Sequence, residues 1–185
     1  MIEKKEIRRR IKEKRELMPE ETMLKNSAII KDKLLQRKEY KEAKEIYIYM
    51  SFEGEVDTRK IIEESIKQGK KVAIPKIIEE QMRFFYIDSI ENTEVGYYGI
   101  LEPKGTERNE SKPDGNSLII MPGVAFDYQM NRIGYGKGFY DKYLSKNKFS
   151  KKFALAFDFQ IFESISNNKY DVKPDIIITE NKTIE

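Results

Sequence analysis

The sequence contains no cysteine and no histidine among its 185 residues. Without cysteine the chain can form no disulfide bond, thiolate nucleophile or thiolate-bound metal site. Without histidine it lacks the commonest general base and the usual zinc ligand. Any catalysis must therefore depend on carboxylates, lysine, arginine, tyrosine and backbone dipoles, together with a hard metal ion where one is needed.

The sequence also has no long apolar run and no strong excess of charge of one sign. No stretch approaches the length of about 20 residues that a membrane-spanning helix requires, and the basic N-terminus lacks an apolar signal-peptide core. We therefore expect a cytoplasmic protein with no membrane partner. Lys and Arg number 35 against 32 acidic residues, and this net charge of +3 is too small to favour a nucleic-acid partner. The length suits one well-buried core, so we expect a single domain over residues 1–185.

The most informative stretch is a glycine-rich turn with Gly134, Gly136 and Gly138 at alternate positions. Glycine adopts positive φ and lets a ligand approach the backbone, and successive N–H groups in such a turn can bind an anion. Residues 139–144 are expected to begin a helix, whose N-terminus adds free N–H donors. An apolar strand over 117–121 is expected upstream. The order strand, glycine turn, helix is typical of phosphate-binding sites.

Charged residues flank this turn. Arg132 precedes it, Lys137 lies inside it, and Asp141 follows on the first helical turn, where a carboxylate could hold a metal ion that bridges phosphates. The Gly-x-Gly-x-Gly spacing matches neither the dinucleotide fingerprint nor the P-loop. Because a glycine-rich turn is as often only a turn, it is the clustering of charges that favours phosphate.

The first half of the chain predicts a β-α-β unit. A strand over 46–50 leads into a loop and then a helix that Gly69 ends, and a second strand over 72–74 is expected to end at Pro75. Such a crossover implies parallel strands, with ligands at their carboxyl ends. The loop over 52–55 and the loop after Met121 should then lie on the ligand side, although Glu55 could equally be a solvated carboxylate.

The remaining elements carry fewer functional signals. The expected elements are helices over 3–18 and from 19 onward, an edge strand over 82–87, a strand over 153–157, a short helix over 160–165 and a last strand over 176–178. Lys4 and Arg8 share one face of the first helix, which is either solvated or able to reach a phosphate. Tyr97 and Tyr98 could stack on a flat heterocycle, but we favour buried packing.

These residues together resemble the 5-formyltetrahydrofolate cyclo-ligase (5,10-methenyltetrahydrofolate synthetase) family over nearly the whole chain. The strongest similarity lies in residues 121–123, 125–127 and 131–141, and weaker similarity lies in 4–8, 55–58, 99–103 and 170–175. The resemblance implies a single-domain α/β three-layer sandwich, Rossmann-like, with a mostly parallel mixed sheet and helices on both faces.

The resemblance also implies an ATP-dependent ring closure. The substrate 5-formyltetrahydrofolate would become 5,10-methenyltetrahydrofolate, with ADP and phosphate as the other products and a phosphorylated formyl group, an iminium phosphate, as the intermediate. Mg²⁺ would be the cofactor, and the protein would be a monomer. Since phosphoryl transfer needs mainly positioning and charge neutralisation, the absence of Cys and His is no obstacle.

Site residues follow from the resemblance position by position. ATP contacts are implied for Lys4, Lys5, Glu6, Ile7, Arg8, Arg132, Ile133, Gly134, Tyr135, Gly136, Lys137, Gly138, Phe139 and Tyr140. Substrate contacts are implied for Arg8, Met50, Glu55, Tyr135, Gly136, Lys137, Gly138 and Phe139. Catalytic roles are implied for Arg132, Lys137 and Tyr140, and Mg²⁺ binding for Asp141 and Asp171, with Asp175 as the alternative to Asp171. The chain departs from the family pattern at Tyr135, where many members have a basic residue, and at Tyr170, where members often have histidine.

Two other functions compete with the ligase. A small-molecule kinase could use the same glycine-rich phosphate loop, but it would leave a stable phosphorylated product, whereas the ligase creates the near-ultraviolet absorbance of a methenyl folate. A nucleic-acid-binding module could use the basic first helix. Its affinity would fall steeply with salt.

Overall fold

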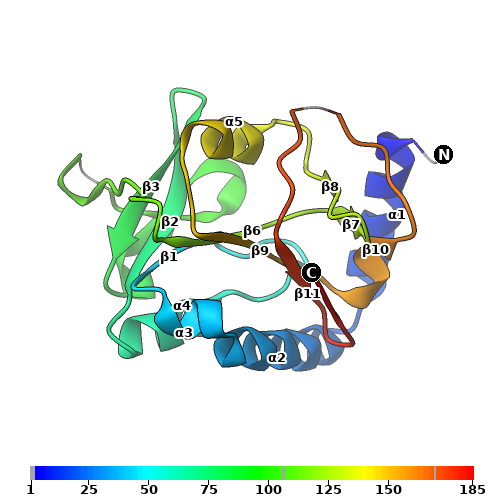
Figure 1. Ribbon diagram of the computed structural model, residues 1–185, viewed down its shortest axis with the longest axis horizontal. Helices are drawn as coiled ribbons and strands as arrows, with labels where there is room; N and C mark the ends of the chain where they lie inside the picture. Colours follow the sequence, from blue (N-terminus) through cyan, green and yellow to red (C-terminus); the bar gives the residue numbers. More distant parts are fainter. Residues whose placement is uncertain (1–2, 106, 169) are drawn as a thin grey trace.

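The computed structural model describes residues 3–105, 107–168 and 170–185, and a seven-stranded sheet forms its centre (Figure 1). The strand order is β12-β11-β9-β6-β1-β2-β3. The inner neighbours are parallel, and the edge strands β3 and β12 are antiparallel to their neighbours. The bounds are β1 Glu45–Ile48, β2 Lys71–Ile78, β3 Gln81–Ile87, β6 Leu118–Met121, β9 Lys151–Leu155, β11 Ile176–Ile178 and β12 Thr183–Ile184.

Helices cover both faces of this sheet. Figure 1 shows α2, α3 and α4 below the sheet and α5 above it. Beside the sheet, α1 lies against a small sheet of order β10-β7-β8. The bounds are α1 Lys4–Leu17, α2 Glu20–Gln36, α3 Lys38–Glu42, α4 Arg59–Lys67, α5 Phe139–Lys146, β7 Ala125–Asp127, β8 Arg132–Ile133 and β10 Ile161–Phe162. The predicted α/β fold with a mostly parallel mixed sheet is confirmed.

The shorter elements join these layers. The hairpin of β4 Thr93–Val95 and β5 Leu101–Pro103 encloses the 3₁₀ turn η2 Tyr97–Gly99. The other 3₁₀ turns are η1 Ile90–Asn92, η3 Glu107–Asn109 and η4 Asp158–Gln160. None of the helices in the described part of the chain combines the length and apolarity needed to cross a membrane.

The apolar run of β6 is explained by burial on two sides. Leu118 and Ile120 belong to the core cluster that includes α2, α3 and α4, whereas Ile119 and Met121 belong to the cluster that includes α5. All four side chains are completely buried. A parallel strand covered on both faces needs apolar residues at every position, which is why the run shows no alternation.

The order of the parallel strands determines where a ligand can bind. From β1 the chain crosses to β2 on one side, and it later returns to β6 on the other side of β1. Because β2 and β6 lie on opposite sides of β1, the strand order reverses between β1 and β6. The carboxyl ends of these two strands therefore border a crevice, which is where ligands typically bind in such sheets. The predicted parallel pairing of the β-α-β unit is confirmed by the register of β1 with β2.

Pro75 does not end its strand, contrary to the prediction. β2 continues through Pro75 to Ile78 and pairs with β3 from Val72 to Ile78. The ladder between β1 and β2 ends at Ala73, so the β1 side of β2 needs no N–H donor beyond that point. Proline is tolerated where one edge of a strand is unpaired.

Three further predictions are wrong. Residues 160–165 form no helix, because η4 is followed directly by β10 and the buried Gln160 uses its side chain to accept from the Phe157 N–H at 2.8 Å. β11 is not the last strand, since β12 returns beside it. The strand before the glycine turn is β8 rather than β6, because the β7–β8 hairpin lies between them.

Candidate active site

A cavity of about 1210 Å³ opens at the carboxyl ends of β1 and β6. Met50 follows β1 and Pro122 follows β6, and both line the cavity. The glycine turn over 134–138 and the Lys4 and Arg8 side chains of α1 complete the same wall. The cavity thus joins segments from the beginning, the middle and the end of the chain.

Most of the predicted site residues lie around this cavity. The lining includes Lys4, Arg8, Met50, Glu55, Arg132, Gly134, Tyr135, Gly136, Lys137, Gly138, Phe139, Tyr140, Asp141 and Asp171. Its described members do not include Lys5, Glu6, Ile7 or Ile133. Ile7 and Ile133 are buried between α1 and the small sheet, and Glu6 forms ion pairs with arginines on the opposite, exposed face of α1. The Asp175 carboxylate, the alternative metal ligand, pairs instead with Lys152 at 3.0 Å.

The glycine turn has the backbone that its sequence predicted. Gly136 has a φ of +104° and Gly138 a φ of +69°, so both occupy the region that side chains disfavour. Gly138 precedes α5, and within the described residues no side chain caps the first N–H groups of that helix. Arg8 Nε donates to the Gly134 carbonyl at 2.8 Å and fixes the start of the turn. The glycine turn and the first residues of α5 line the cavity, so their uncapped N–H groups and the positive helix end are available to a ligand there.

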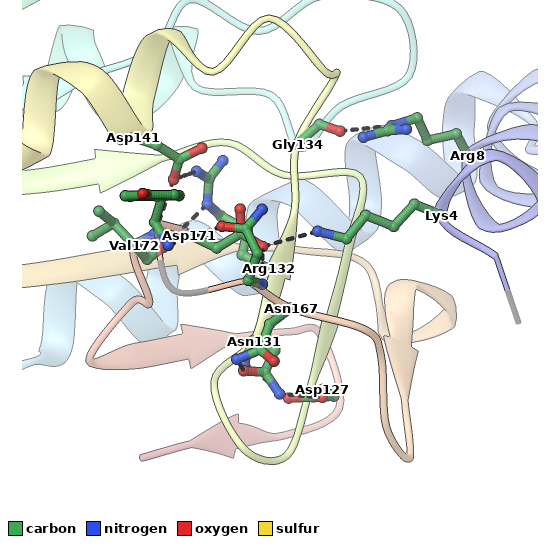
Figure 2. A network of polar contacts seen from close by, with 12 residues as sticks. Lys4, Arg8, Asp127, Asn131, Arg132, Gly134, Asp141, Asn167, Asp171 and Val172 are labelled. Carbon is green, nitrogen blue, oxygen red and sulfur yellow. Dashed lines mark hydrogen bonds and ion pairs between the residues drawn. The ribbon is translucent and has the colours of Figure 1, made fainter. Parts of the chain in front are cut away.

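Two ion pairs join residues that line the cavity, and Figure 2 shows them together. Arg132 Nη2 lies 2.6 Å from Asp141 Oδ1, which also accepts the Val172 N–H at 2.9 Å. Lys4 Nζ lies 2.9 Å from Asp171 Oδ2. Burial opposes ionisation of Asp171, but the hydrogen bonds from Lys4 and the Asn168 N–H outweigh it and lower the pKa of this carboxyl. The cations that pair with these two carboxylates could also bind phosphate.

Asp141 and Asp171 are carboxylates of the kind that could hold a magnesium ion together with a nucleotide. Within the described ranges, Asp141 Oδ2 and Asp171 Oδ1 accept no hydrogen bond, so each side chain keeps one oxygen for another ligand. No group of three or more acidic residues able to hold a metal exists in the part of the chain that the structure describes. Mg²⁺ characteristically binds one or two carboxylates and takes its other ligands from phosphates and water.

Asp127 connects the two sides of this arrangement from below (Figure 2). It is completely buried, and its two oxygens accept four hydrogen bonds, from Gln129 N, Asn131 N, Asn131 Nδ2 and Ile165 N. Asn131 Oδ1 in turn accepts from Asn167 Nδ2 at 2.8 Å. The hairpin that carries Arg132 is thereby joined to the segment that leads to Asp171. The sequence motif contained Asp127 without indicating this role.

Known proteins match this chain along nearly its whole length. The model of the 5-formyltetrahydrofolate cyclo-ligase family matches residues 1–180. The chain belongs to this family. Among its relatives, the mouse (Mus musculus) 5-formyltetrahydrofolate cyclo-ligase is 30% identical, with 96% of this chain and 94% of that protein covered. A Schizosaccharomyces pombe protein, named a probable 5-formyltetrahydrofolate cyclo-ligase, is 34% identical, with 79% of each chain covered.

A solved structure agrees with the sequence comparisons. The NMR structure of Aquifex aeolicus 5,10-methenyltetrahydrofolate synthetase superposes with a TM-score of 0.87 at 31% identity, covering 98% of this chain and 91% of that one. Membership of an ATP-dependent cyclo-ligase family confirms the prediction of a C–N bond-forming enzyme of folate and one-carbon metabolism. The kinase and the nucleic-acid module are the weaker alternatives for this reason.

In this cyclo-ligase, the cavity lining also contains a buried carboxylate, that of Glu55. Glu55 is only 8% exposed. Its Oε1 accepts from the Tyr135 hydroxyl and its Oε2 from the Phe52 N–H at 3.0 Å. Burial raises the pKa of Glu55, while the Arg15 charge and the Tyr135 hydrogen bond act in the opposite direction. The alternative of a solvated loop carboxylate is therefore wrong.

The sequence analysis did not identify Arg15 as a residue that contacts the site. It donates from Nη1 to the Tyr135 hydroxyl at 2.6 Å. The signal was present, since Arg15 follows Arg8 by seven residues and therefore lies on the same face of α1 as Lys4 and Arg8.

Tyrosines supply the remaining polar and aromatic surface. The Tyr140 hydroxyl is buried in the cavity wall and has no hydrogen-bond partner among the residues described. Burial raises the pKa of Tyr140, so it remains a donor. Tyr97 and Tyr98 line the cavity with 47% and 61% of their surface exposed, and the expectation that they are buried is wrong. Their rings are free to contact a flat ligand.

Proposed function

We propose that the cavity binds Mg-ATP and 5-formyltetrahydrofolate next to each other, and that the chain closes the methenyl ring by phosphorylating the formyl oxygen. One observation carries this proposal. The lining of a single cavity combines a glycine turn, cations and two carboxylates with aromatic rings and the buried carboxylate of Glu55. These two sets of residues have the chemistry needed by a triphosphate and by a pterin.

The nucleotide would bind at the glycine turn. Its phosphates would accept from the turn N–H groups and the N-terminus of α5, with Lys4, Arg8 and Lys137 as cations around them. When phosphate oxygens attract Lys4 and Arg132, Asp171 and Asp141 become available to a metal ion. Mg²⁺ bound there would neutralise charge on the transferring phosphoryl group.

The folate would lie beside the aromatic rings and Glu55. Glu55 is suited to accept N–H groups of the pterin, and Met50 would contact its ring. Phe52, Tyr97 and Tyr98 supply aromatic surface for the flat part of the molecule. In this orientation the formyl group would lie towards the glycine turn.

The chemistry then needs no protein nucleophile. The formyl oxygen attacks the γ-phosphorus, a new O–P bond forms, and the bond to the bridging oxygen of ADP breaks. The neighbouring folate nitrogen attacks the activated formyl carbon, loses its proton, and phosphate departs with the electrons of the C–O bond. Arg132, Lys137 and the Tyr140 hydroxyl would stabilise the charge that moves between these oxygens.

A spectroscopic assay tests this function. The purified protein is mixed with 5-formyltetrahydrofolate and Mg-ATP, and the expected result is a rise in near-ultraviolet absorbance with one ADP formed per folate consumed. A reaction with a non-hydrolysable ATP analogue is the control and should give no rise. A stable phosphorylated folate without the absorbance change would favour the kinase instead. The expectations of a monomer, a single domain and a cytoplasmic location stay predictions.

A further inference from the structure

Arg15 lies behind the cavity wall, where three segments of the site meet. Spacings of four and seven residues place Lys4, Arg8 and Arg15 on one face of α1. Lys4 contacts Asp171 and Arg8 contacts the Gly134 carbonyl, and both line the cavity. Arg15 is absent from the described lining, so it has no direct route to a ligand. Neither the family motif nor the chemistry above gives it a role.

Arg15 contacts three segments of the site: the glycine turn, the loop after β6 and the loop that carries Glu55. Nη1 donates to the Tyr135 hydroxyl at 2.6 Å, and Nη2 donates to the Gly123 carbonyl at 3.1 Å. The guanidinium also lies 5.9 Å from the centre of the Tyr135 ring. Gly54 packs on its stem, since a Cβ at Gly54 would come within 2.9 Å of Arg15 Cβ. One side chain therefore joins the loop of Glu55 to the glycine turn.

Tyr135 transmits this contact to Glu55. Its hydroxyl accepts from Arg15 and donates to Glu55 Oε1, so the three groups form a chain of hydrogen bonds. A buried carboxylate without such partners would take up a proton, because burial penalises its charged form. Protonation would turn one of its acceptor oxygens into a donor.

We propose that Arg15 is a positioning residue of the folate end of the cavity. Through Tyr135 and through its own charge it holds Glu55 as an ionised acceptor aimed at the substrate, without touching the substrate itself. The inference rests on the proposed function, in which Glu55 accepts N–H groups of the pterin. Arg8 fixes the glycine turn separately, so nucleotide affinity does not depend on Arg15.

The groups that face Glu55 come from every element around it. They are Arg15 on α1, Tyr135 on the glycine turn, Tyr140 on α5, Tyr49 after β1 and Glu53 in its own loop. Among the causes that lower the pKa of Glu55, the charge of Arg15 is the largest. Its removal should raise that pKa further, so the acceptor form is lost at higher pH.

Separate binding measurements for the two substrates test the proposal. Calorimetry gives the Kd of 5-formyltetrahydrofolate, and of a non-hydrolysable ATP analogue with Mg²⁺, across a pH series. For Arg15→Met we expect folate binding to weaken about tenfold at neutral pH. We expect the loss of folate affinity at acid pH to begin at a higher pH than in the wild type. The nucleotide Kd should stay within about twofold of the wild-type value.

Three further variants make the experiment specific. Arg15→Lys keeps the charge but not the fork of donors, so it should restore the pH profile and only part of the affinity. Tyr135→Phe should weaken folate binding about fivefold, and less than that when combined with Arg15→Met. Arg9→Met is the control, because Arg9 lies on the exposed face of the same helix and pairs with Glu6 and Glu13.

Each result supports or overturns the proposal. An unchanged folate Kd and pH profile in Arg15→Met would overturn it, as would equal loss of folate and nucleotide binding with an unaltered unfolding curve. If Arg15→Met does not fold, the folate Kd of Tyr135→Phe tests the proposal instead. Unchanged folate affinity in Tyr135→Phe would overturn it. Failure of the wild-type protein to bind folate would instead contradict the proposed function.

Discussion

At the residue scale, the Tyr140 hydroxyl is a buried donor that is still without a partner in the described structure. Leaving such a group unpaired costs free energy, which a ligand oxygen would recover. Replacing Tyr140 by Phe removes this donor and keeps the ring. We expect kcat for ring closure to fall by about ten- to a hundredfold, with smaller changes in KM, because the lost hydrogen bond is strongest in the transition state.

Steady-state assays of Tyr140→Phe should be read beside Tyr128→Phe. Tyr128 is exposed and lies outside the cavity lining, and its hydroxyl contacts Lys182 Nζ at 3.1 Å. The control should retain wild-type kcat. Equal turnover of Tyr140→Phe and wild type would show that the hydroxyl does not act in the reaction.

Gly136 tests whether the backbone itself binds phosphate. A Cβ at this position would lie 3.8 Å from Arg8 Nη2, so alanine meets no clash inside the protein. The φ of +104° nevertheless strains any side chain, by about 1–2 kcal/mol. We expect Gly136→Ala to weaken binding of the ATP analogue at least about tenfold, because the new methyl group lies between the amides and the phosphates.

Gly115→Ala separates strain from ligand contact. Gly115 has a φ of +89°, lies in a loop outside the cavity lining, and would place its Cβ in open space. Both variants should lose similar amounts of unfolding free energy in urea titrations, and only Gly136→Ala should lose nucleotide affinity. Equal nucleotide Kd values for the two would contradict a phosphate-binding turn.

Site residues could be predicted from the sequence where the pattern that identifies them lies within one helix face or one turn. Lys4 and Arg8 were recognised from their spacing on α1, and the glycine turn from its missing side chains. Arg15 shares that face, but its partner Tyr135 is 120 positions away, and no local pattern links the two. Tyr97 and Tyr98 were misjudged because their exposure depends on a cavity that other segments build.

At the element scale, Asp127 determines how the β7–β8 hairpin meets the segment before Asp171. Asparagine in its place would bring an NH₂ group toward backbone N–H donors, leaving buried donors unpaired. We expect Asp127→Asn to lose on the order of 2–4 kcal/mol of unfolding free energy. The apparent Kd for Mg²⁺ in the nucleotide complex should also rise, because Asp171 loses its support.

Urea unfolding and a magnesium titration of nucleotide binding measure the two effects. Asp114→Asn is the matched control, since Asp114 accepts a similar backbone hydrogen bond, from Asn116 N at 2.9 Å, in an exposed loop. That variant should change neither quantity by much. A fully stable Asp127→Asn protein would mean that the four hydrogen bonds are not what holds the hairpin.

Elements were predictable when their pattern reflected their own burial. The run of β6 and the stripes of α1 gave correct elements because each describes one buried face or strand. Pro75 was misleading because a strand can contain proline only where one of its edges is unpaired. Here that depends on where the pairing of β1 with β2 ends, which the sequence around Pro75 does not reveal. Residues 160–165 were misleading because Gln160 is satisfied by the carbonyls of Gly123 and Val124, which no helix period reveals.

At the scale of the whole molecule, ion pairs join distant segments and make folding sensitive to acid. Asp171 pairs with Lys4, Asp158 with Lys182 and Glu185 with Arg37, and each of these carboxyls has a lowered pKa although burial opposes it. Their stabilisation is present above the unfolded pKa values of 3.8 for Asp and 4.5 for Glu. It is lost as pH falls through the lower folded values.

Glu55 should give the opposite dependence, because burial raises its pKa above the ordinary value of 4.5. A raised pKa means that the folded state holds the proton more tightly than the unfolded chain. The resulting stability is complete below pH 4.5 and is lost as pH rises through the folded pKa. Replacing Glu55 by Gln removes this dependence, so the variant should gain stability relative to wild type as pH rises toward neutral.

The sequence makes this measurement unusually clear, since a chain without histidine has no side chain whose ordinary pKa lies in the range of about 5 to 8. Urea unfolding of wild type and Glu55→Gln at several pH values gives the difference in unfolding free energy. Glu63→Gln, an exposed position paired with Lys60 on α4, is the control and should follow the wild-type curve. Parallel curves for wild type and Glu55→Gln would contradict a buried, perturbed Glu55, and would remove the electrostatic reason for placing Arg15 behind it.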